Sequence, residues 1–330
     1  MDLSEEGMKM ENKYFVGIDT SAYTTSLAVI DGDNNIVLNL RKTLKVKEGQ
    51  RGLRQQEAVF QHINNLPHLI EEMTANIDIN GIVTVSCSNK PRNVEGSYMP
   101  VFIVGRNQAF ILSKILGANF KEYSHQEGHI GAGIMGSSLK CSERFFCLHI
   151  SGGTTELLLV SNKGNRIYVE IIGGTLDISL GQLIDRIGVK LGFRFPCGQD
   201  LDRISQTGRP LNLKVPIKIS KGTWFNLSGL ENYFSSLIES KNYDLEDIVS
   251  TLFSAVTNLI FKVINNAYME YGLKEILITG GVSANNFIRS HLNENLVDKG
   301  IKPYFAQKKM STDNGVGIAF LGKEGYIVGD

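Results

Sequence analysis

Hydrophobic positions near the start of the chain form short apolar runs separated by turn residues. The run Tyr14–Ser21 is apolar and ends in small and hydroxyl residues, and it is followed by two more runs, Ser26–Ile30 and Ile36–Leu40. The last two are separated by Asp31–Asn34, a cluster of residues typical of turns. Short apolar runs bounded in this way are typical of β-strands. The pattern predicts three consecutive antiparallel strands.

The same pattern returns in the second half of the chain. Apolar runs cover Phe145–Ile150, Glu156–Val160 and Ile167–Ile172. A glycine and hydroxyl cluster, Ser151–Thr155, follows the first run, and the turn residues Asn162–Asn165 precede the third. The sequence therefore predicts one fold unit that occurs twice.

The elements that follow also correspond in the two halves, since each half continues with a helix, a strand and a second helix. They are Leu53–Met73, Ile82–Ser86 and Gly105–Leu116 in the first half, and Leu245–Tyr271, Glu275–Thr279 and a helix that begins near Ala284 in the second. This duplication resembles the actin-like ATPase and sugar-kinase (ribonuclease H-like) fold. We therefore predict an α/β protein of two lobes with a nucleotide in an interlobe cleft. Two unrelated α/β domains are the alternative.

Length and composition bound the organisation of the chain. A chain of 330 residues is long for a single hydrophobic core. We predict a disordered tail over residues 1–12, a first lobe of residues 13–123 plus about 312–330, and a second lobe of residues 124–311 that carries the metal and nucleotide site.

Charge and cysteine content narrow the class of protein. Basic and acidic residues number 34 each, so the summed charge gives no electrostatic signature of nucleic-acid binding. We find no pattern of a membrane span or a signal peptide, and we expect no membrane partner. The four cysteines are scattered without a CxxC pair, which favours reduced thiols and a cytoplasmic protein.

Two histidines are the first candidate for a chemical site. His125 and His129 are four residues apart, so on a helix they share one face, as two ligands of one metal require. Two hydrogen-bonded structural histidines are the alternative. Asp313, near the start of a C-terminal helix, is a candidate third ligand. The alternative is that Asp313 is an ordinary residue in the N-cap region of that helix. A metalloprotease function is disfavoured, because Gln126 and not glutamate follows the first histidine.

Glycine-rich turns suggest a second site, for a nucleotide. Ser151-Gly152-Gly153 follows one predicted strand, and Gly280–Asn285 links another to a helix, so both could offer backbone N–H groups to phosphates. Asp185 and Asp202 flank a loop that contains Gly198, where carboxylates suit ribose hydroxyls. Ordinary turns and surface charges are the alternatives.

These segments together resemble the tRNA threonylcarbamoyladenosine transferase (TsaD) family, formerly called glycoprotease, over about residues 14–325. The family's His-x-Glu-Gly-His motif matches His125–His129, its Gly-Gly-Val-Ser-Ala-Asn matches Gly280–Asn285, and its Thr-Asp-Asn matches Thr312–Asn314. Two looser matches are Gly181–Arg186 and Phe225–Leu230.

The resemblance implies roles for the matched residues. One divalent metal ion, iron or zinc, would bind His125, His129 and Asp313. Threonylcarbamoyl adenylate, or ATP or AMP, would bind a set of second-lobe residues, namely Ser151, Gly152, Gly153, Asp185, Gly198, Asp202 and Asn285. The implied reaction transfers the threonylcarbamoyl group to adenosine 37 of tRNA, with the metal acting as a Lewis acid. Small partner subunits of a tRNA-modification complex are also implied.

Departures from the family motifs keep other functions open. The family begins with Glu-Thr-Ser-Cys-Asp-Glu-Thr, where this chain has Asp19–Thr25, and its Gly-Pro-Gly loop is replaced by Ser88–Gly96. The alternatives are a divergent paralogue that carbamoylates another acceptor, an actin-like ATPase or kinase with Asp19 on magnesium, and a non-catalytic partner subunit. A metalloprotease is the least favoured.

Overall fold

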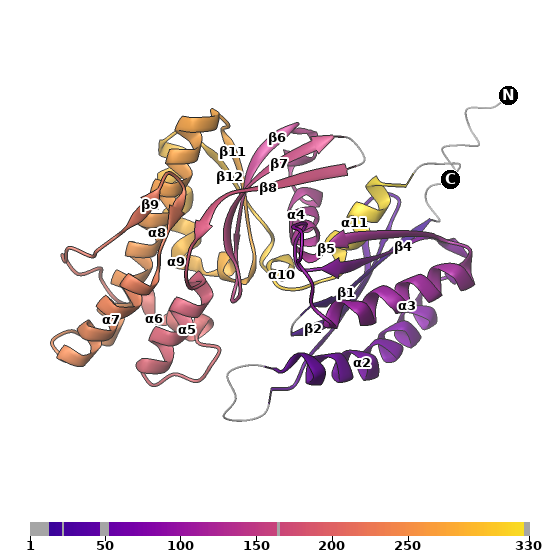
Figure 1. The fold of residues 1–330 in the computed structure, drawn as a ribbon, viewed down its shortest axis with the longest axis horizontal. Helices are drawn as coiled ribbons and strands as arrows, with labels where there is room; N and C mark the ends of the chain where they lie inside the picture. Colours follow the sequence, from indigo (N-terminus) through magenta and orange to yellow (C-terminus); the bar gives the residue numbers. More distant parts are fainter. Residues whose placement is uncertain (1–12, 22, 47–52, 164–165, 327–330) are drawn as a thin grey trace. The chain divides into compact units, whose positions relative to one another are not determined.

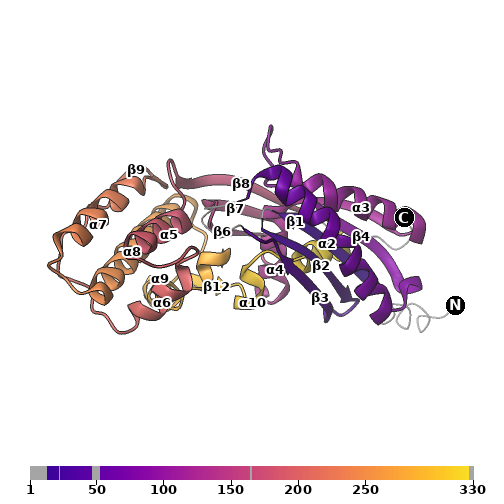
Figure 2. The same cartoon turned by 90° about the horizontal axis from the view of Figure 1, so that it is seen from below.

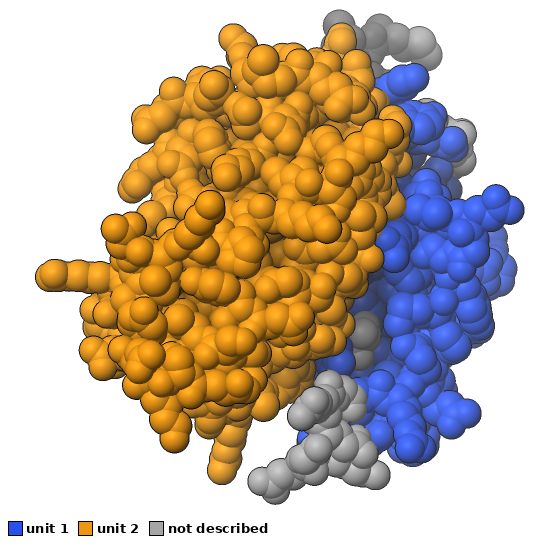
Figure 3. Space-filling model, turned by 60° about the vertical axis from the view of Figure 1, so that its left-hand side comes forward, with its two compact units in different colours: residues 1–140, 162–168, 312–330 blue, residues 141–161, 169–311 orange. Residues whose placement is uncertain are grey.

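The chain divides into two compact units, which Figure 3 shows in different colours. The computed structural model describes residues 13–21, 23–46, 53–163 and 166–326, so the predicted tail over residues 1–12 lies outside it. Unit 1 comprises Met1–Lys140, Asn162–Tyr168 and Thr312–Asp330, and unit 2 comprises Cys141–Ser161 and Val169–Ser311. The predicted boundary at residue 124 therefore differs from this division, which groups both candidate metal histidines with unit 1.

Unit 1 contains a five-stranded sheet in the order β3-β2-β1-β4-β5 (Figure 1). Its strands are β1 (Tyr14–Ser21), β2 (Thr24–Asp31), β3 (Ile36–Thr43), β4 (Ile82–Lys90) and β5 (Asn119–Ser124). β1, β2 and β3 pair antiparallel, whereas β4 runs parallel to β1 and β5 runs parallel to β4. The three predicted strands of the meander are confirmed.

Helices cover both faces of this sheet. Helices α2 (Gln55–Asn76) and α3 (Val101–Leu116) lie side by side on one face, and α4 (His125–Met135) and α11 (Val316–Glu324) contact each other on the other face (Figures 1 and 2). Side chains alternate along β1, so Val16 and Ile18 join the apolar cluster beneath α2 and α3, while Gly17 faces α11. Asp19 shares the parity of Gly17, which directs it to the face that carries α4.

Unit 2 contains a seven-stranded sheet in the order β12-β11-β6-β7-β8-β10-β9. Its strands are β6 (Arg144–Ile150), β7 (Thr155–Lys163), β8 (Arg166–Thr175), β9 (Ile219–Lys221), β10 (Trp224–Phe225), β11 (Glu275–Thr279) and β12 (Lys302–Phe305). The ends of β7 and β8 that fall in Asn162–Tyr168 are grouped with unit 1. β11 runs parallel to both β6 and β12.

The two sheets share one strand order. Read from the third strand of each meander, unit 1 runs β3-β2-β1-β4-β5 and unit 2 runs β8-β7-β6-β11-β12, with β10 and β9 added at the edge. The duplicated fold unit predicted from the sequence is therefore confirmed.

The core of unit 2 is built around one long helix. The remaining helices are α5 (Leu180–Lys190), α6 (Gly198–Ser205), α7 (Ser228–Ser240), α8 (Leu245–Tyr271), α9 (Asn286–Asp298) and α10 (Lys308–Ser311), with short 3-10 turns at η1 (Ile79–Gly81), η2 (Ser138–Cys141) and η3 (Gly281–Ala284). Among the described helices, α8 alone is long and apolar enough to cross a membrane by length and composition. Because 72% of its apolar window is buried, it reads as a core helix of unit 2.

Candidate metal centre

The N-terminus of α4 fixes the first candidate ligand. Ser124 is the N-cap, with its Oγ accepting from Glu127 N at 3.2 Å, and Glu127 Oε2 accepts from Ser124 N at 2.6 Å. This capping box starts the helix at His125. It also engages the Glu127 carboxylate with the backbone, so this side chain is not placed as the general base that a metalloprotease needs.

Three side chains bring their donor atoms together within unit 1. The Nε2 atoms of His125 and His129 are 3.1 Å apart. Asp313 Oδ1 lies 3.5 Å from Nε2 of His125 and 3.6 Å from Nε2 of His129. His129 is buried, and the other two side chains are partly exposed. The structure thus brings together all three residues that the sequence singled out as ligands.

These separations fit a single metal ion. In a tetrahedral site with metal–ligand bonds of about 2.0–2.2 Å, neighbouring ligand atoms are about 3.4 Å apart. The three measured separations, from 3.1 to 3.6 Å, lie close to that value. Two imidazoles and one carboxylate are also a donor set that suits iron and zinc. The residues present therefore fit the implied metal.

Backbone contacts between α4 and α11 bring Asp313 to the histidines. A Cβ added at Gly317 would lie 1.8 Å from Gly128 O, and one added at Gly131 would lie 2.7 Å from Gly317 O. The two helices therefore touch through glycines. The segment before α11 is equally close to the sheet, since a Cβ at Gly315 would lie 2.4 Å from Gly17 O.

Asp19 holds His125 from behind. The Asp19 carboxylate is buried, and its Oδ1 accepts from His125 Nδ1 at 3.1 Å. It also accepts hydrogen bonds from the hydroxyls of Ser21 and Ser88. A carboxylate can only accept here, so Nδ1 carries a proton, and Nε2 is the nitrogen that faces the other two candidate ligands. The sequence offered Asp19 only as a magnesium ligand, because its partner His125 is distant in the chain.

The electrostatics of the cluster favour a bound cation. Burial lowers the pKa of His125, but the Asp19 and Asp313 carboxylates outweigh burial and raise that pKa to about 9. Burial and the charge on His125 both lower the pKa of His129. Despite burial, hydrogen bonding to His129 and the charge on His125 hold the pKa of Asp313 well below its usual range. Two ionised carboxylates thus face the imidazoles.

The predicted nucleotide residues all lie in unit 2, where Ser151–Gly153 follow the carboxyl end of β6 and Asn285 follows that of β11. Gly280 has φ +93°, and an added Cβ would lie 2.3 Å from Ile150 O, so only glycine fits between the two strand ends. Added Cβ atoms at Gly152 and Gly153 would meet no heavy atom within 4 Å. The carboxyl ends of neighbouring parallel strands are where α/β folds bind ligands.

Four further predicted residues connect helices around this edge. Asp185 Oδ1 accepts from Cys197 N at 2.8 Å, which joins α5 to the start of α6 at Gly198. Both oxygens of Asp202 accept from Asn286 N, at 3.0 and 2.9 Å, and Asn285 Oδ1 accepts from Ile288 N. Asp202 and Asn285 therefore hold the N-terminus of α9, a role that the sequence did not suggest.

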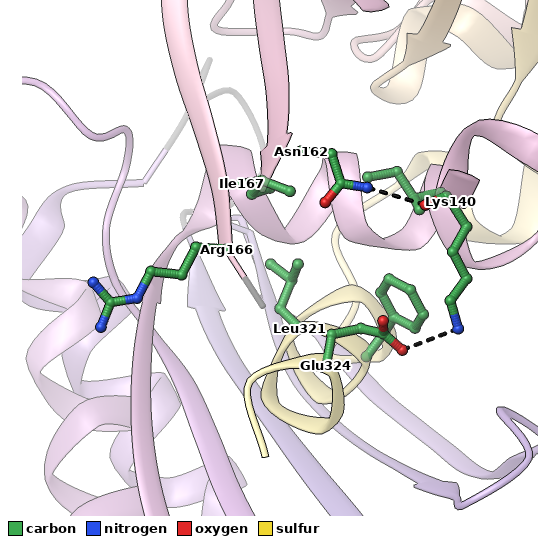
Figure 4. Close-up of a pocket in the computed structure, with 8 residues that line it drawn as sticks. Lys140, Asn162, Arg166, Ile167, Leu321 and Glu324 are labelled. Atoms are coloured by element: carbon green, nitrogen blue, oxygen red, sulfur yellow. Dashed lines mark hydrogen bonds and ion pairs between the residues drawn. The ribbon is translucent and has the colours of Figure 1, made fainter. Parts of the chain in front are cut away.

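A small pocket in unit 1 is separate from all of these residues (Figure 4). It is lined by Ile134, Lys140, Asn162, Arg166, Ile167, Phe320, Leu321 and Glu324. Lys140 pairs with Glu324 at 3.2 Å, and Arg166 extends away from this pair. None of the predicted site residues lines the pocket.

Comparison with known proteins decides the family. A model of the family described as tRNA N6-adenosine threonylcarbamoyltransferase (TsaD) matches residues 35–320. The chain belongs to this family. A relative of that name from Persephonella marina is 31% identical over 317 residues, which cover 93% of this chain and 88% of the relative. The TsaD resemblance drawn from three short motifs is thereby confirmed.

Solved structures support the fold alone. HypF from T. kodakarensis matches with a TM-score of 0.63 at 13% identity over 94% of this chain, which spans about half (48%) of HypF. A ROK family glucokinase from Streptomyces griseus, solved with glucose and AMPPNP, matches with a TM-score of 0.52 at 10% identity over 94% of this chain and 100% of its own. The actin-like ATPase and sugar-kinase fold predicted for this TsaD-family chain is confirmed.

Proposed function

We propose that this chain transfers a threonylcarbamoyl group from threonylcarbamoyl adenylate to adenosine 37 of tRNA. The observation that carries the proposal is the convergence of His125, His129 and Asp313, whose ligand atoms all lie within 4.8 Å of one another, in a chain of the TsaD family. The relative from Persephonella marina carries the name of this activity. A tRNA acceptor also makes the cytoplasm the proposed location.

Unit 1 supplies the metal ligands in this proposal. His125, His129 and Asp313 would hold one iron or zinc ion, which when bound would supply a Lewis acid for the carbamoyl carbonyl. Asp19 accepts a hydrogen bond from Nδ1 of His125, which would leave the Nε2 atom to bind the metal ion. Transfer forms a bond from the exocyclic amine of adenosine to the carbamoyl carbon and breaks the bond from that carbon to the phosphate oxygen. AMP leaves, and the amine gives up one proton.

Unit 2 supplies the nucleotide contacts in this proposal. The turn Ser151–Gly153 and the turn that begins at Gly280 offer backbone N–H groups to the AMP phosphate. Asp185, of which the Oδ1 atom accepts from Cys197 N, is proposed for the ribose. Gly198 is proposed to lie against the ligand, since the space beside its Cα is open, with no heavy atom within 4 Å of an added Cβ. Asp202 and Asn285 accept hydrogen bonds from the first backbone N–H groups of α9 and so position the turn that precedes this helix.

The alternatives have less support from the geometry. An actin-like ATPase would need Asp19 on magnesium, but this buried carboxylate accepts from one histidine and two serines. A metalloprotease would need a base near the histidines, and Glu127 instead caps α4. A non-catalytic subunit gives no reason for three convergent metal ligands. Partner subunits that assist the transfer remain part of the proposal.

The test is complementation of a strain that lacks the tRNA modification, followed by nucleoside analysis of its tRNA. We expect wild-type protein to restore threonylcarbamoyladenosine and His129→Ala to fail. Folded, metal-loaded protein that leaves the tRNA unmodified would refute the tRNA acceptor. If that protein still released AMP from the donor, the result would favour a paralogue that acts on another acceptor.

A further inference from the structure

Arg41 lies on β3, on the sheet face that carries the candidate metal ligands. The strand register sets Asp19 opposite Ser26, and Ser26 opposite Arg41. Directly paired residues of antiparallel strands project to the same face of a sheet. Arg41 therefore shares the face of Asp19, two strand spacings away, or roughly 10 Å between the backbones.

The Arg41 side chain reaches the segment that carries the third ligand. Its Nη1 donates to Thr312 Oγ1 at 3.0 Å, and its Nε donates to Asn39 Oδ1 at 3.1 Å. Thr312 directly precedes Asp313 within unit 1, so the guanidinium contacts the residue next to the third candidate ligand and is near enough for the Asp313 carboxylate to affect its pKa. Burial lowers the pKa of Arg41 and the Asp313 carboxylate raises it, yet guanidinium stays protonated in proteins. A fixed positive charge is thus held next to the centre.

Formal charges show what this arginine adds. Asp19 and Asp313 carry two negative charges, which one divalent ion balances, while the two coordinating imidazoles are neutral. Arg41 then leaves an excess of one positive charge at the centre. Such a centre favours a substrate group that brings a negative charge of its own.

We propose that Arg41 binds the carboxylate of the threonine part of the donor and so selects a carboxylate-bearing group for transfer. This inference rests on the proposed function. The planar guanidinium matches a carboxylate with two parallel hydrogen bonds, which lysine cannot reproduce. Arg41 holds the donor through the reaction and exchanges no proton, so the balance of the transfer step is unchanged.

A tRNA phosphate is the competing anion for Arg41. Two features favour the donor. Arg41 is half-buried on the face of the metal ligands, and the donor must present its carbamoyl group to that centre for transfer. Phosphate contacts typically come from exposed basic side chains and weaken steeply with salt.

The experiment compares two non-hydrolysable donor analogues, one with threonine and one with threoninamide in place of threonine. Binding to metal-loaded protein is measured by calorimetry without tRNA. We expect Arg41→Gln to weaken binding of the threonine analogue about 10- to 100-fold, the loss expected for a charge-assisted bidentate contact, and to leave the amide analogue unchanged. Arg41→Lys should restore only part of the loss.

Lys42→Gln is the matched control. Lys42 is exposed and follows Arg41 on β3, where it pairs with Thr25, so its side chain lies on the opposite face of the sheet. The substitution Lys42→Gln therefore removes the same charge as Arg41→Gln, but from the other face. It should leave binding of both analogues unchanged. Equal weakening of both analogues by Arg41→Gln, or no weakening, would overturn the inference, as would a salt-dependent loss of tRNA affinity alone. If wild-type protein binds neither analogue, the proposed function fails as well.

Discussion

The two units use one strand order to present different chemistry. In unit 1, β1 pairs with β2 as far as Ser21 and Thr24, and the site is made by side chains of the strand end and of α4. In unit 2, β6 pairs with β7 as far as Ile150 and Thr155, and the turn between them contains two glycines. The end of the first strand therefore presents an acidic side chain in one unit and leads to exposed backbone groups in the other.

The fold fixes where a site forms but not its chemistry. At the end of β1, Asp19 and Ser21 project toward α4, where histidines meet them. At the end of β6, Gly152 and Gly153 have no side chain, which suits a ligand with its own charge. Substitutions in each unit should therefore separate metal binding from nucleotide binding.

The largest effect should come from a ligand of unit 1. His129→Ala removes one of three metal ligands, so bound metal should fall from about one ion per chain to background, and transfer activity should fall with it. Metal analysis of purified protein measures this. Asp185→Asn in unit 2 is the paired variant, which should keep the metal and weaken nucleotide binding. If both variants lost metal equally, the assignment of separate roles to the units would be wrong.

The next effect concerns the packing that positions Asp313. Gly317→Ala places a methyl group against Gly128 O, where an added Cβ has no room, and should lower the free energy of unfolding by about 3 kcal/mol. Chemical denaturation measures the change. Gly229→Ala on α7 is the control, because its added Cβ meets nothing within 4 Å. That control should be neutral or stabilise by up to about 1 kcal/mol. Equal changes would refute the close contact of α4 and α11.

A smaller effect on metal affinity is expected from Asp19, which contacts the ligand His125. Asp19→Asn removes the charge that orients His125 and should weaken metal affinity about 10- to 100-fold without abolishing binding. Competition with a chelator of known affinity measures the change. Ser26→Ala, a buried neighbour on the same sheet face, should leave affinity unaltered. A ligand role for Asp19 would instead appear as complete loss of metal.

The smallest effect tests a carboxylate in unit 2 that serves only the fold. Partial burial raises the pKa of Asp177, but hydrogen bonds from Leu227 N, from Ser228 and from Ile178 N hold that pKa well below its usual range. A lowered folded-state pKa contributes stability above the unfolded value of about 3.9 and loses it as the pH falls further. Asp177→Asn should cost about 1 kcal/mol at pH 7 for this exposed group and less at pH 3, where the unfolded-state carboxyl is already largely protonated.

Denaturation at the two pH values measures this prediction. Asp200→Asn, which removes an exposed partner of Arg203, should change stability by less than about 0.5 kcal/mol at either pH. A pH-independent loss in Asp177→Asn would mean that the substitution acts through packing and not through charge.

Much of the fold could be predicted from local patterns, and the exceptions have physical causes. The limits of α8 and β11 match the apolar runs, because both elements are buried. β4 extends past the predicted end at Ser86 to Lys90, and β5 was not predicted. These segments are polar strands, and their pairing with each other, not an apolar pattern, makes them strands.

The site divides in the same way. The spacing of His125 and His129 could be predicted because it depends only on the helical repeat. The contacts of Asp19 with His125 and of Arg41 with Thr312 could not, because they join positions far apart in the chain. Asp202 was assigned to the ribose from its position near a glycine loop, whereas its hydrogen bonds to Asn286 emerge only from the packing of α6 on α9.

The order of the metal ligands along the chain also determines when the metal centre can form during synthesis. Unit 1 takes its two histidines from α4 but its aspartate from Thr312–Asp330, after the whole of unit 2. About 180 residues separate His129 from Asp313, which at roughly 5–20 residues per second is about ten to forty seconds of translation. During that interval a ribosome-bound chain displays the histidines without Asp313. Capture of the metal by all three ligands therefore has to wait until Asp313 has been synthesised.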